Sequence, residues 1–245
     1  MEKQFKLDIH VHTSETSSCG QVSAQEAVRL YEQAGYDGII ITDHYHREYF
    51  NSLGNLTWND KIDCYLKGYR TAKSEAAKGK MKVFLGIEYR NVESDNDYLV
   101  FGMDESMLFK EPELYSRSIQ DAFACFRQYG AIILQAHPFR KRFEKDKGDF
   151  VRYSSMDYPE LLDGFEFYNG NKNWIQDPAE TKAAAEKYPN LILVSGSDFH
   201  HPSHLATGGI ILNGNFDTIQ EIAEAVRNNE IRELIHSDEN ELKMG

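Results

Sequence analysis

The chain has 245 residues, of which 41% are hydrophobic, enough for one large domain with a sizeable core. Its mean hydropathy of −0.58 and the lack of an apolar run of membrane length argue against a membrane protein. The formal charge of −12 disfavours long nucleic acids, which need a basic face, but still allows a small anion held by bound metal ions.

Cysteine usage and the N-terminal residues indicate the cellular compartment. Cys19, Cys64 and Cys125 are odd in number and scattered, so they imply no disulfide framework. The first predicted strand begins too early to leave room for a signal peptide. We therefore expect a cytoplasmic protein made of one domain, residues 1–245. The sequence gives no indication of oligomeric state.

The first predicted strand already carries chemistry. Residues 6–13 read Lys-Leu-Asp-Ile-His-Val-His-Thr, in which apolar and polar residues alternate with the period of a strand. His10 and His12, two residues apart, therefore share a face. Two neutral imidazoles so placed are half of a divalent-metal site. Alternatively, one imidazole lies in the core and the other on the surface, and this strand alone does not decide.

The rest of the chain alternates helical and strand patterns. Ser23 and Glu26 have the spacing of a capping box, which starts an amphipathic helix that ends at Gly35. Further helices are predicted at 57–78, 119–129, 178–187 and 217–228, the last capped by Asp217. Further strands are predicted at 38–42, 81–87, 98–101, 131–135, 164–168, 191–194 and 207–212. Residues 140–152 read as a charged loop, and the residues after 228 as a polar tail.

This alternation predicts the fold class. Strands that alternate with helices imply βαβ units and a parallel sheet. With about seven strands and no obvious linker, we expect an α/β fold whose sheet forms a closed or nearly closed barrel.

Candidate metal ligands follow the ends of the apolar strands. They are His10, His12, His44, Glu88, His137, Asp198 and His200. In parallel α/β barrels this carboxyl rim is where active sites are built. Each residue alone is more often structural or solvated, but together they predict metal binding. Imidazoles and carboxylates without thiolates suit Zn, Mn or Fe at a catalytic site.

Five motifs around these residues occur in a fixed order. They are His10-Val-His12, Thr42-Asp43-His44, Gly86-Ile-Glu88, Ala136-His137-Pro138 and Ser197-Asp198-Phe-His200. Together they resemble the metal-binding motifs of the PHP (polymerase and histidinol phosphatase) family, from the first strand to about residue 210. The resemblance implies a distorted (β/α)7 barrel, similar to a TIM barrel, with two or three divalent ions at its mouth. Members of the family include phosphomonoesterases, nucleotide phosphoesterases and nuclease modules.

The resemblance also implies which residues hold each ion. The first position would be held by His10, His12, Glu88 and Asp198. Glu88 would bridge to a second position that His137 completes. His44 and His200 would hold the third position.

The chain departs from the family pattern at two places. In the loop after the first strand, where the family often has His or Asp, this chain offers Glu15 and Cys19. We favour Glu15 as the substitute ligand, although the loop length also allows Cys19. Before the fourth strand, where a histidine is usual, this chain has Asp97, which is a competent ligand; otherwise the ion beside Glu88 and His137 is weakly held.

Other polar residues have two readings each. Arg140 follows His137 by three residues and can clamp a phosphate with its guanidinium fork, or can belong to a solvated basic loop. Glu166 and Asn169 can orient ligands or substrate, or can pack in the core. His46 lies outside the motifs and is expected to be no ligand.

This chemistry predicts hydrolysis of a phosphate ester. A water that bridges two divalent ions becomes a nucleophile near neutral pH, and the ions neutralise the phosphate oxygens. Asp198 or a rim histidine such as His200 can protonate the leaving alkoxide. We expect a phosphoesterase for a small phosphorylated metabolite, such as a compound like histidinol phosphate or a nucleotide. The alternatives are a nuclease or nucleotide phosphoesterase, a (β/α)8 amidohydrolase, and a non-catalytic metal-binding regulatory module.

Overall fold

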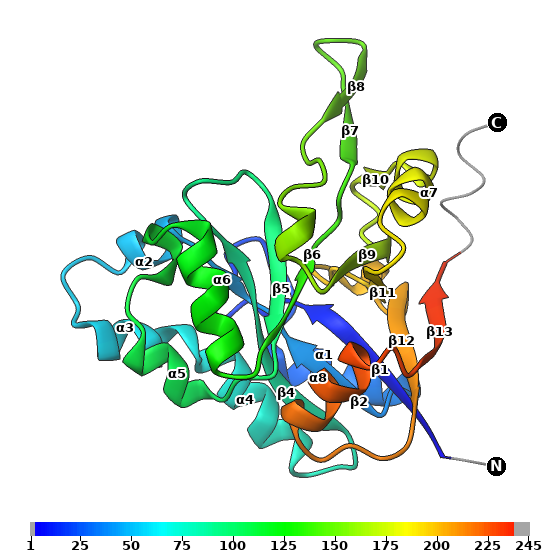
Figure 1. The fold of residues 1–245 in the computed structure, drawn as a ribbon. Helices are drawn as coiled ribbons and strands as arrows, with labels where there is room; N and C mark the ends of the chain where they lie inside the picture. The colour runs from blue at the N-terminus through cyan, green and yellow to red at the C-terminus, as the bar shows by residue number, and fades with distance from the viewer. Residues whose placement is uncertain (1–2, 238–245) are drawn as a thin grey trace.

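The structure is a computed structural model that describes residues 3–237. A mixed ten-stranded sheet forms its centre, and helices cover its outer face (Figure 1). The strands of this sheet are β1 (Gln4–Val11), β2 (Gly38–Ile41), β3 (His44–Tyr45), β4 (Lys82–Arg90), β5 (Asp97–Phe101), β6 (Ile132–Gln135), β9 (Gly164–Asn169), β11 (Ile192–Gly196), β12 (Gly208–Asn213) and β13 (Ile231–His236). Their order is β11-β9-β6-β5-β4-β2-β1-β12-β13, with β3 beside β4.

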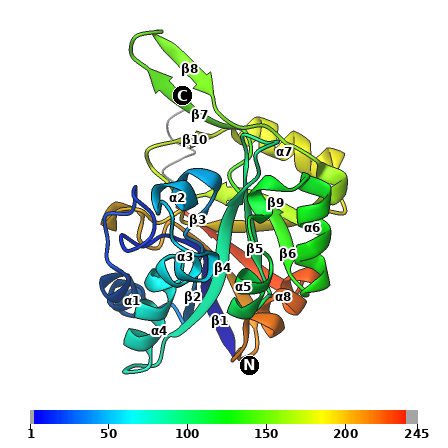
Figure 2. The same ribbon diagram turned by 90° about the vertical axis from the view of Figure 1, so that its left-hand side faces the viewer.

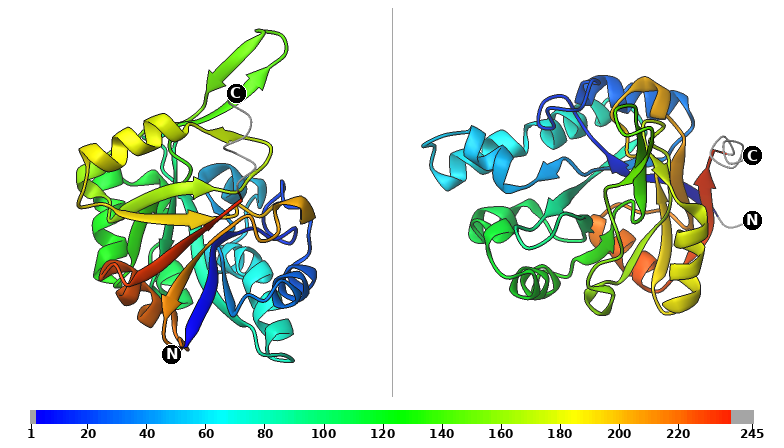
Figure 3. Two further views of the ribbon diagram at one scale, coloured as in Figure 1. Left: turned by 90° about the vertical axis from the view of Figure 1, so that its right-hand side faces the viewer. Right: turned by 90° about the horizontal axis from the view of Figure 1, so that it is seen from above.

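The sheet curls into a nearly closed barrel, as the sequence predicted (Figure 3). Beyond β11, the chain meets the end of β1 through a parallel bridge between Val11 and Phe199. The Ser195 hydroxyl of β11 also donates a hydrogen bond to the carbonyl of Ile235 in β13. The expectation of parallel pairing holds for β1, β2 and β4 and for β6, β9 and β11. It is wrong for β5 and β12, which run antiparallel to both of their neighbours.

The helices are α1 (Ala24–Gln33), α2 (Arg47–Ser52), α3 (Trp58–Tyr65), α4 (Lys67–Ala76), α5 (Glu105–Lys110), α6 (Ile119–Gln128), α7 (Pro178–Lys187) and α8 (Ile219–Arg227), with short 3-10 turns at Leu114–Ser116, Pro159–Leu161 and Pro202–His204. The helices α1, α6, α7 and α8 are close to the predicted ranges, whereas α2 and α5 were not predicted. The α8 N-cap is Thr218, in a capping box with Glu221, and not the expected Asp217. None of the helices in the described part of the chain has the length and hydrophobicity of a membrane span.

The helix predicted at 57–78 is two helices, α3 and α4, because a side chain enters its hydrogen-bond ladder. The Thr16 hydroxyl donates to the carbonyl of Tyr65 at 3.0 Å and accepts from the amide of Gly68 at 3.3 Å. A side-chain group inserted in this way breaks or bends a helix. Gly68 also lets this helix end pack closely on Thr13, because a Cβ at position 68 would lie 2.0 Å from the Thr13 hydroxyl.

Two segments that were predicted to be irregular form strands. The expected loop at 140–152 is a hairpin of β7 (Arg140–Glu144) and β8 (Asp149–Arg152), which pairs with β10 (Ile175–Gln176). The hairpin projects from the body of the protein (Figures 1 and 2), and its Phe143 and Phe150 rings lie 5.3 Å apart. The start of the expected polar tail is β13, because Ile231, Leu234 and Ile235 pack partly against the core. Residues 238–245 lie outside the described part.

The apolar core leaves one end of the barrel to polar residues. Phe5, Leu7 and Ile9 of β1 belong to a buried cluster that includes residues of α8. A second cluster packs residues of α1, α3, α4 and α6 against the outer face of the sheet. Where these clusters end, at the carboxyl ends of β1, β2 and β4, the buried residues become polar. The candidate site lies at this end of the barrel.

Candidate metal centre

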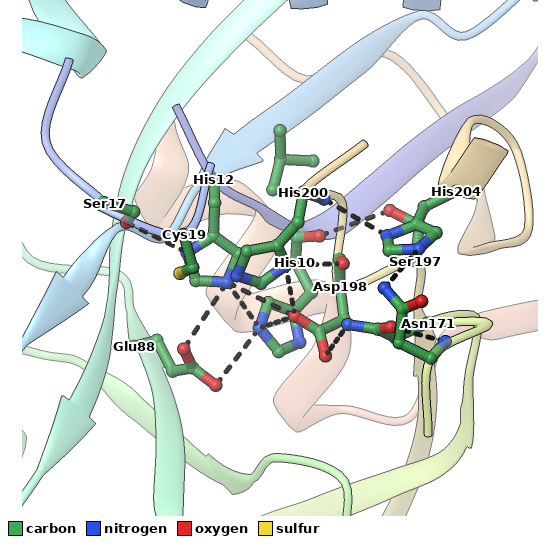
Figure 4. Close-up of polar contacts among 12 residues, drawn as sticks. His10, His12, Ser17, Cys19, Glu88, Asn171, Ser197, Asp198, His200 and His204 are labelled. Carbon is green, nitrogen blue, oxygen red and sulfur yellow. Dashed lines mark hydrogen bonds and ion pairs between the residues drawn. The ribbon is translucent and has the colours of Figure 1, made fainter. Parts of the chain in front are cut away.

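Side chains from five strand ends converge at this end of the barrel. They are His10 and His12 at the end of β1, His44 in β3, Glu88 in β4, His137 after β6, and Asp198 and His200 after β11. Figure 4 shows the side chains of His10, His12, Glu88, Asp198 and His200. His44 and His200 are 21% and 14% exposed, and the other five are at most 2% exposed. The structure therefore brings together all seven residues that the strand-end pattern singled out.

Glu88 lies at the centre of this cluster. Its Oε1 lies 3.3 Å from His10 Nε2 and 2.9 Å from His137 Nε2. Its Oε2 lies 2.6 Å from His44 Nδ1 and 3.4 Å from His12 Nε2. One carboxylate thus faces four imidazoles, which suits a ligand shared between two cations.

Asp198 faces the opposite side of the same imidazoles. Its Oδ1 lies 3.5 Å from the Nε2 atoms of both His10 and His12, and 3.1 Å from His200 Nδ1. The Asn171 amide donates a hydrogen bond to the other oxygen, Oδ2, at 3.0 Å. Asp198 has a φ of 50°, which is uncommon for a residue with a side chain and is typical of functional sites.

The spacing of these atoms fits divalent metal ions. Three groups each place their ligand atoms within 4.8 Å of one another, namely His12, His44 and His200; His10, Glu88 and His137; and His10, His12 and Asp198. Glu88 Oε2 and His44 Nδ1 are buried and close, yet among the described residues neither has a partner with hydrogen-bond geometry. A cation bound by Glu88 would compensate for the burial of this carboxylate.

The electrostatics favour the ligand forms of Glu88, Asp198 and His12. Burial would lower the pKa values of His10, His44 and His200, but nearby carboxylates outweigh burial and raise them, so a metal ion at these imidazoles would replace a proton. Burial alone would raise the pKa of Glu88, but the charges of His44 and His10 outweigh burial and hold the pKa well below its usual range. His10 and His200 act in the same way on the pKa of Asp198. Burial, and then the charges of His200 and His44, lower the pKa of His12 well below its usual value. The carboxylates are therefore anionic, and His12 is neutral.

Glu166 supports the cluster from behind. Its Oε1 lies 2.9 Å from His10 Nδ1, and both side chains are fully buried. Its Oε2 accepts hydrogen bonds from the backbone amide of His137 at 2.7 Å and from the side chain of Asn169 at 2.9 Å. Of the two readings given by the sequence, the structure agrees with the one in which Glu166 and Asn169 orient candidate ligands.

Asp43 and Ser17 form a second support, which sequence reasoning missed. The Ser17 hydroxyl lies 3.2 Å from His12 Nδ1 and donates a hydrogen bond to Asp43 at 2.7 Å. Asp43 also accepts hydrogen bonds from the backbone amide and the hydroxyl of Thr13. The available signal was the position of Asp43 directly before His44 in a motif.

The loop after β1 corrects the preference for Glu15. The Glu15 carboxylate accepts a hydrogen bond from the backbone amide of Ala24 at the start of α1, outside the three groups. Cys19 instead places its Sγ 3.2 Å from His44 Nε2. Burial would raise the pKa of the Cys19 thiol, but hydrogen bonds to His200 and His44 outweigh burial and lower it to about 6.

Asp97 borders the cluster but is already paired. The Arg90 guanidinium donates to both of its carboxylate oxygens at 2.7 Å, and the nearest candidate ligand atom, His137 Nε2, lies 3.9 Å away. Asp97 is absent from the three groups of ligand atoms. The bidentate pair therefore competes with the metal binding expected of Asp97.

Arg140 lies at the mouth of the cluster. Its Nη1 lies 3.3 Å from His137 Nε2 and 3.9 Å from Asp198 Oδ2, and its guanidinium stacks on the Trp174 ring at 4.5 Å. Its Nε is buried without a hydrogen-bond partner among the described residues. A cavity of about 280 Å³ opens here, between the candidate ligands on one side and Arg140 and Trp174 on the other.

Other histidines lie around the cluster. His46 caps α2 by accepting the amide hydrogen of Tyr49, and its ring pairs with Glu48. His204 is buried behind His200, whose backbone amide lies 3.3 Å from its Nδ1. Neither belongs to the three groups of ligand atoms, and that His46 is no ligand stays a prediction.

Comparison with known proteins identifies a family and related folds. A family model of the PHP domain matches residues 8–236. None of the curated proteins compared with the sequence matches it significantly.

Three solved structures resemble the chain. A two-domain protein from Bacteroides vulgatus, which contains a predicted PHP-like metal-dependent phosphoesterase, has a TM-score of 0.65 and 19% identity, over 97% of this chain and 66% of that one. The lesion-specific endonuclease EndoQ from Pyrococcus furiosus has a TM-score of 0.61 and 13% identity, over 95% of this chain and 58% of that one. An amidohydrolase from Chromobacterium violaceum, with bound sulfate and no metal, has a TM-score of 0.53 and 15% identity, over 90% and 96%. At these identities the likeness concerns the fold.

Proposed function

The chain belongs to the PHP domain family, and we propose that it is a metal-dependent phosphoesterase that hydrolyses a small phosphorylated metabolite. The observation that carries the proposal is the central position of Glu88, whose two oxygens face four imidazoles at distances of 2.6 to 3.4 Å. Enzymes that hydrolyse phosphate esters often use such a shared carboxylate to hold two ions close together.

The three proposed metal positions overlap the three groups of atoms, although Glu88 is added to the first, His10 is left out of the second and His12 is left out of the third. The first position is held by His10, His12, Glu88 and Asp198, the second by Glu88 and His137, and the third by His44 and His200. Divalent ions there would supply water activation and would neutralise the negative charge of the phosphate. Imidazole and carboxylate ligands suit Zn, Mn or Fe.

The remaining residues of the site act on the substrate. Arg140 binds the phosphate oxygens, since its guanidinium lies beside the cluster with one buried N–H unpaired among the described residues. Asp198 and His200 line the cavity and were expected to protonate the leaving alkoxide. Because both are proposed ligands and Asp198 is anionic, water held at the metal centre would supply this proton instead. Glu166 binds no substrate and holds His10 in place.

The size and charge of the mouth support a small substrate. A cavity of about 280 Å³ fits a metabolite or a mononucleotide. The hairpin beside it is basic, but Lys141 pairs with Asp177, Lys147 with Glu144, and Arg152 with Glu180. These pairs leave less positive charge for a polyanion, which counts against a nuclease that acts on long strands.

The test is an activity panel on the purified full chain. The protein is loaded with Mn, Zn or Fe, its metal content is measured, and phosphate release is followed from sugar phosphates, histidinol phosphate, mononucleotides and short oligonucleotides. We expect release from at least one phosphomonoester. Cleavage of oligonucleotides alone would indicate a nuclease. Metal bound without turnover of any substrate would indicate a non-catalytic module.

A further inference from the structure

We propose that Cys19 is a thiolate ligand of the third metal position, which is thus a Cys-His-His site with His44 and His200. The inference rests on the proposed metal centre and deepens it, because it names a ligand and a preference for softer ions such as zinc at this position. The Glu15 carboxylate, the other candidate from the same loop, is bound to the amide of Ala24.

Cys19 is not among the three groups whose ligand atoms all lie within 4.8 Å of one another, but its distance to His44 agrees with a shared cation. Cys19 Sγ lies 3.2 Å from His44 Nε2 and is within hydrogen-bonding reach of His200. In a tetrahedral zinc site with Zn–S of about 2.3 Å and Zn–N of about 2.0 Å, sulfur and nitrogen ligands lie about 3.5 Å apart. A small outward movement of the thiol would therefore accommodate the ion.

Observations that do not involve the cysteine also indicate a cation here. His44, His200 and His12 place their ring nitrogens within 4.8 Å of one another. On the other side of the His44 ring, Glu88 Oε2 lies 2.6 Å from Nδ1. A proton on Nδ1 would leave the lone pair of His44 on Nε2, the atom that faces Cys19. The ring nitrogens of these histidines are therefore arranged to bind a cation on the side of Cys19.

The backbone holds the cysteine in this place. The Gly20 amide donates to the carbonyl of Ser17 at 2.9 Å, and the Gln21 amide donates to the carbonyl of His200 at 2.8 Å. Gly20 also packs so closely on Thr13 that a Cβ there would lie 2.9 Å from its backbone. Cys19 is therefore fixed beside both histidines by bonds on each side of it.

A thiolate changes the charge and the selectivity of the third position. Its imidazoles carry no negative charge when they bind a metal, so the thiolate would supply the anion of this position. Thiolates favour Zn and related soft ions over Mn, whereas the other two positions offer only nitrogen and oxygen ligands. We therefore infer different metal preferences within one centre.

Cobalt spectroscopy tests the ligand directly. The full chain and the variants Cys19→Ser, Cys19→His and Cys64→Ser are loaded with Co²⁺, and metal content and absorption are measured. We expect a thiolate-to-cobalt charge-transfer band in wild type and in Cys64→Ser, the matched control at a half-buried cysteine. Cys19→Ser should lose the band and about one ion per chain, and Cys19→His should keep the ion without the band.

Alkylation by iodoacetamide gives a readout that does not depend on colour or activity. Cys19 is exposed, so we expect its alkylation in the metal-free protein and its protection when zinc is added, with no such change at Cys64. A protein that binds ions and hydrolyses phosphate esters, but has neither the band nor the protection, overturns this inference alone. A protein that binds no ion overturns the proposed function as well.

Discussion

His10 and Glu166 form a fully buried pair in which Nδ1 of the imidazole lies 2.9 Å from Oε1 of the carboxylate. When Nδ1 donates to Glu166, the lone pair of a metal-binding His10 is left on Nε2. This atom points toward Glu88 and Asp198. A carboxylate behind a histidine commonly orients the ring and strengthens metal binding in this way.

We expect Glu166→Gln to weaken metal binding although Glu166 is no ligand. The amide keeps the shape but removes the charge that orients His10, so affinity should fall by about 10- to 100-fold. Titration with Zn or Mn measures the loss, and turnover at saturating metal should recover much of the wild-type rate. Glu160→Gln, at an exposed position, is the control. Unchanged affinity in Glu166→Gln would contradict the positioning role.

Arg140→Ala should impair substrate binding and leave metal content intact. A charge-assisted hydrogen bond is worth about 1.5–3 kcal/mol, so kcat/KM should fall by about 10- to 100-fold. Arg140→Lys should recover only part of the lost kcat/KM, because an ammonium lacks the planar fork of a guanidinium.

Arg142→Ala is the matched control for Arg140, since Arg142 also lies near the Trp174 ring, at 5.4 Å, but is exposed on the hairpin. Steady-state kinetics and metal analysis of the three variants decide the role. Equal losses in Arg140→Ala and Arg142→Ala would point to the hairpin as a whole rather than to a phosphate ligand.

The candidate ligands were predictable because they depend on strand geometry. The i, i+2 spacing of His10 and His12 places both on one face, and the end of each apolar run marks the barrel rim, where Glu88 also lies. The choice between Glu15 and Cys19 was not predictable, because it depends on how the loop is tied to α1.

Two other features of the structure differ from the sequence-based predictions because they depend on contacts between separate elements. The Arg90–Asp97 pair joins neighbouring antiparallel strands, whereas a parallel sheet was expected. The hairpin at 140–152 carries many charges, which suggested a loop, but its charges pair with α7 and its Phe143 and Phe150 rings pack on each other. These contacts depend on how the strands pair and on where α7 lies, which the residue types alone do not show.

The hairpin is fixed to the body by a pair whose strength depends on pH. Lys141 Nζ lies 2.6 Å from Asp177, which also caps α7 through the amides of Ala179 and Glu180. The hydrogen bond from Lys141 lowers the pKa of Asp177 below its ordinary value of 3.8. A lowered carboxyl pKa stabilises the folded state above the unfolded pKa, and this contribution is lost as the pH falls through the folded pKa.

Asp177→Asn should therefore destabilise the protein at neutral pH by about 0.5–1 kcal/mol, because asparagine keeps the cap but loses the charge of a partly exposed pair. The difference from wild type should persist down to about pH 4 and shrink below it. Urea unfolding at several pH values measures it, with Asp149→Asn as the control at an exposed hairpin position. A difference that grows as the pH falls would contradict this account.

Glu88→Gln tests the centre of the site. The amide has nearly the same size but lacks the charge that two shared cations require, so at least one ion and most of the turnover, about 100-fold or more, should be lost. The barrel should stay folded, because its core clusters do not include Glu88. His46→Asn is the control, since asparagine can replace His46 as the α2 cap and the ring lies outside the three groups. Metal analysis, circular dichroism and phosphatase rates are measured side by side. If Glu88→Gln keeps its ions and rate while His46→Asn loses both, the metal centre lies elsewhere than around Glu88.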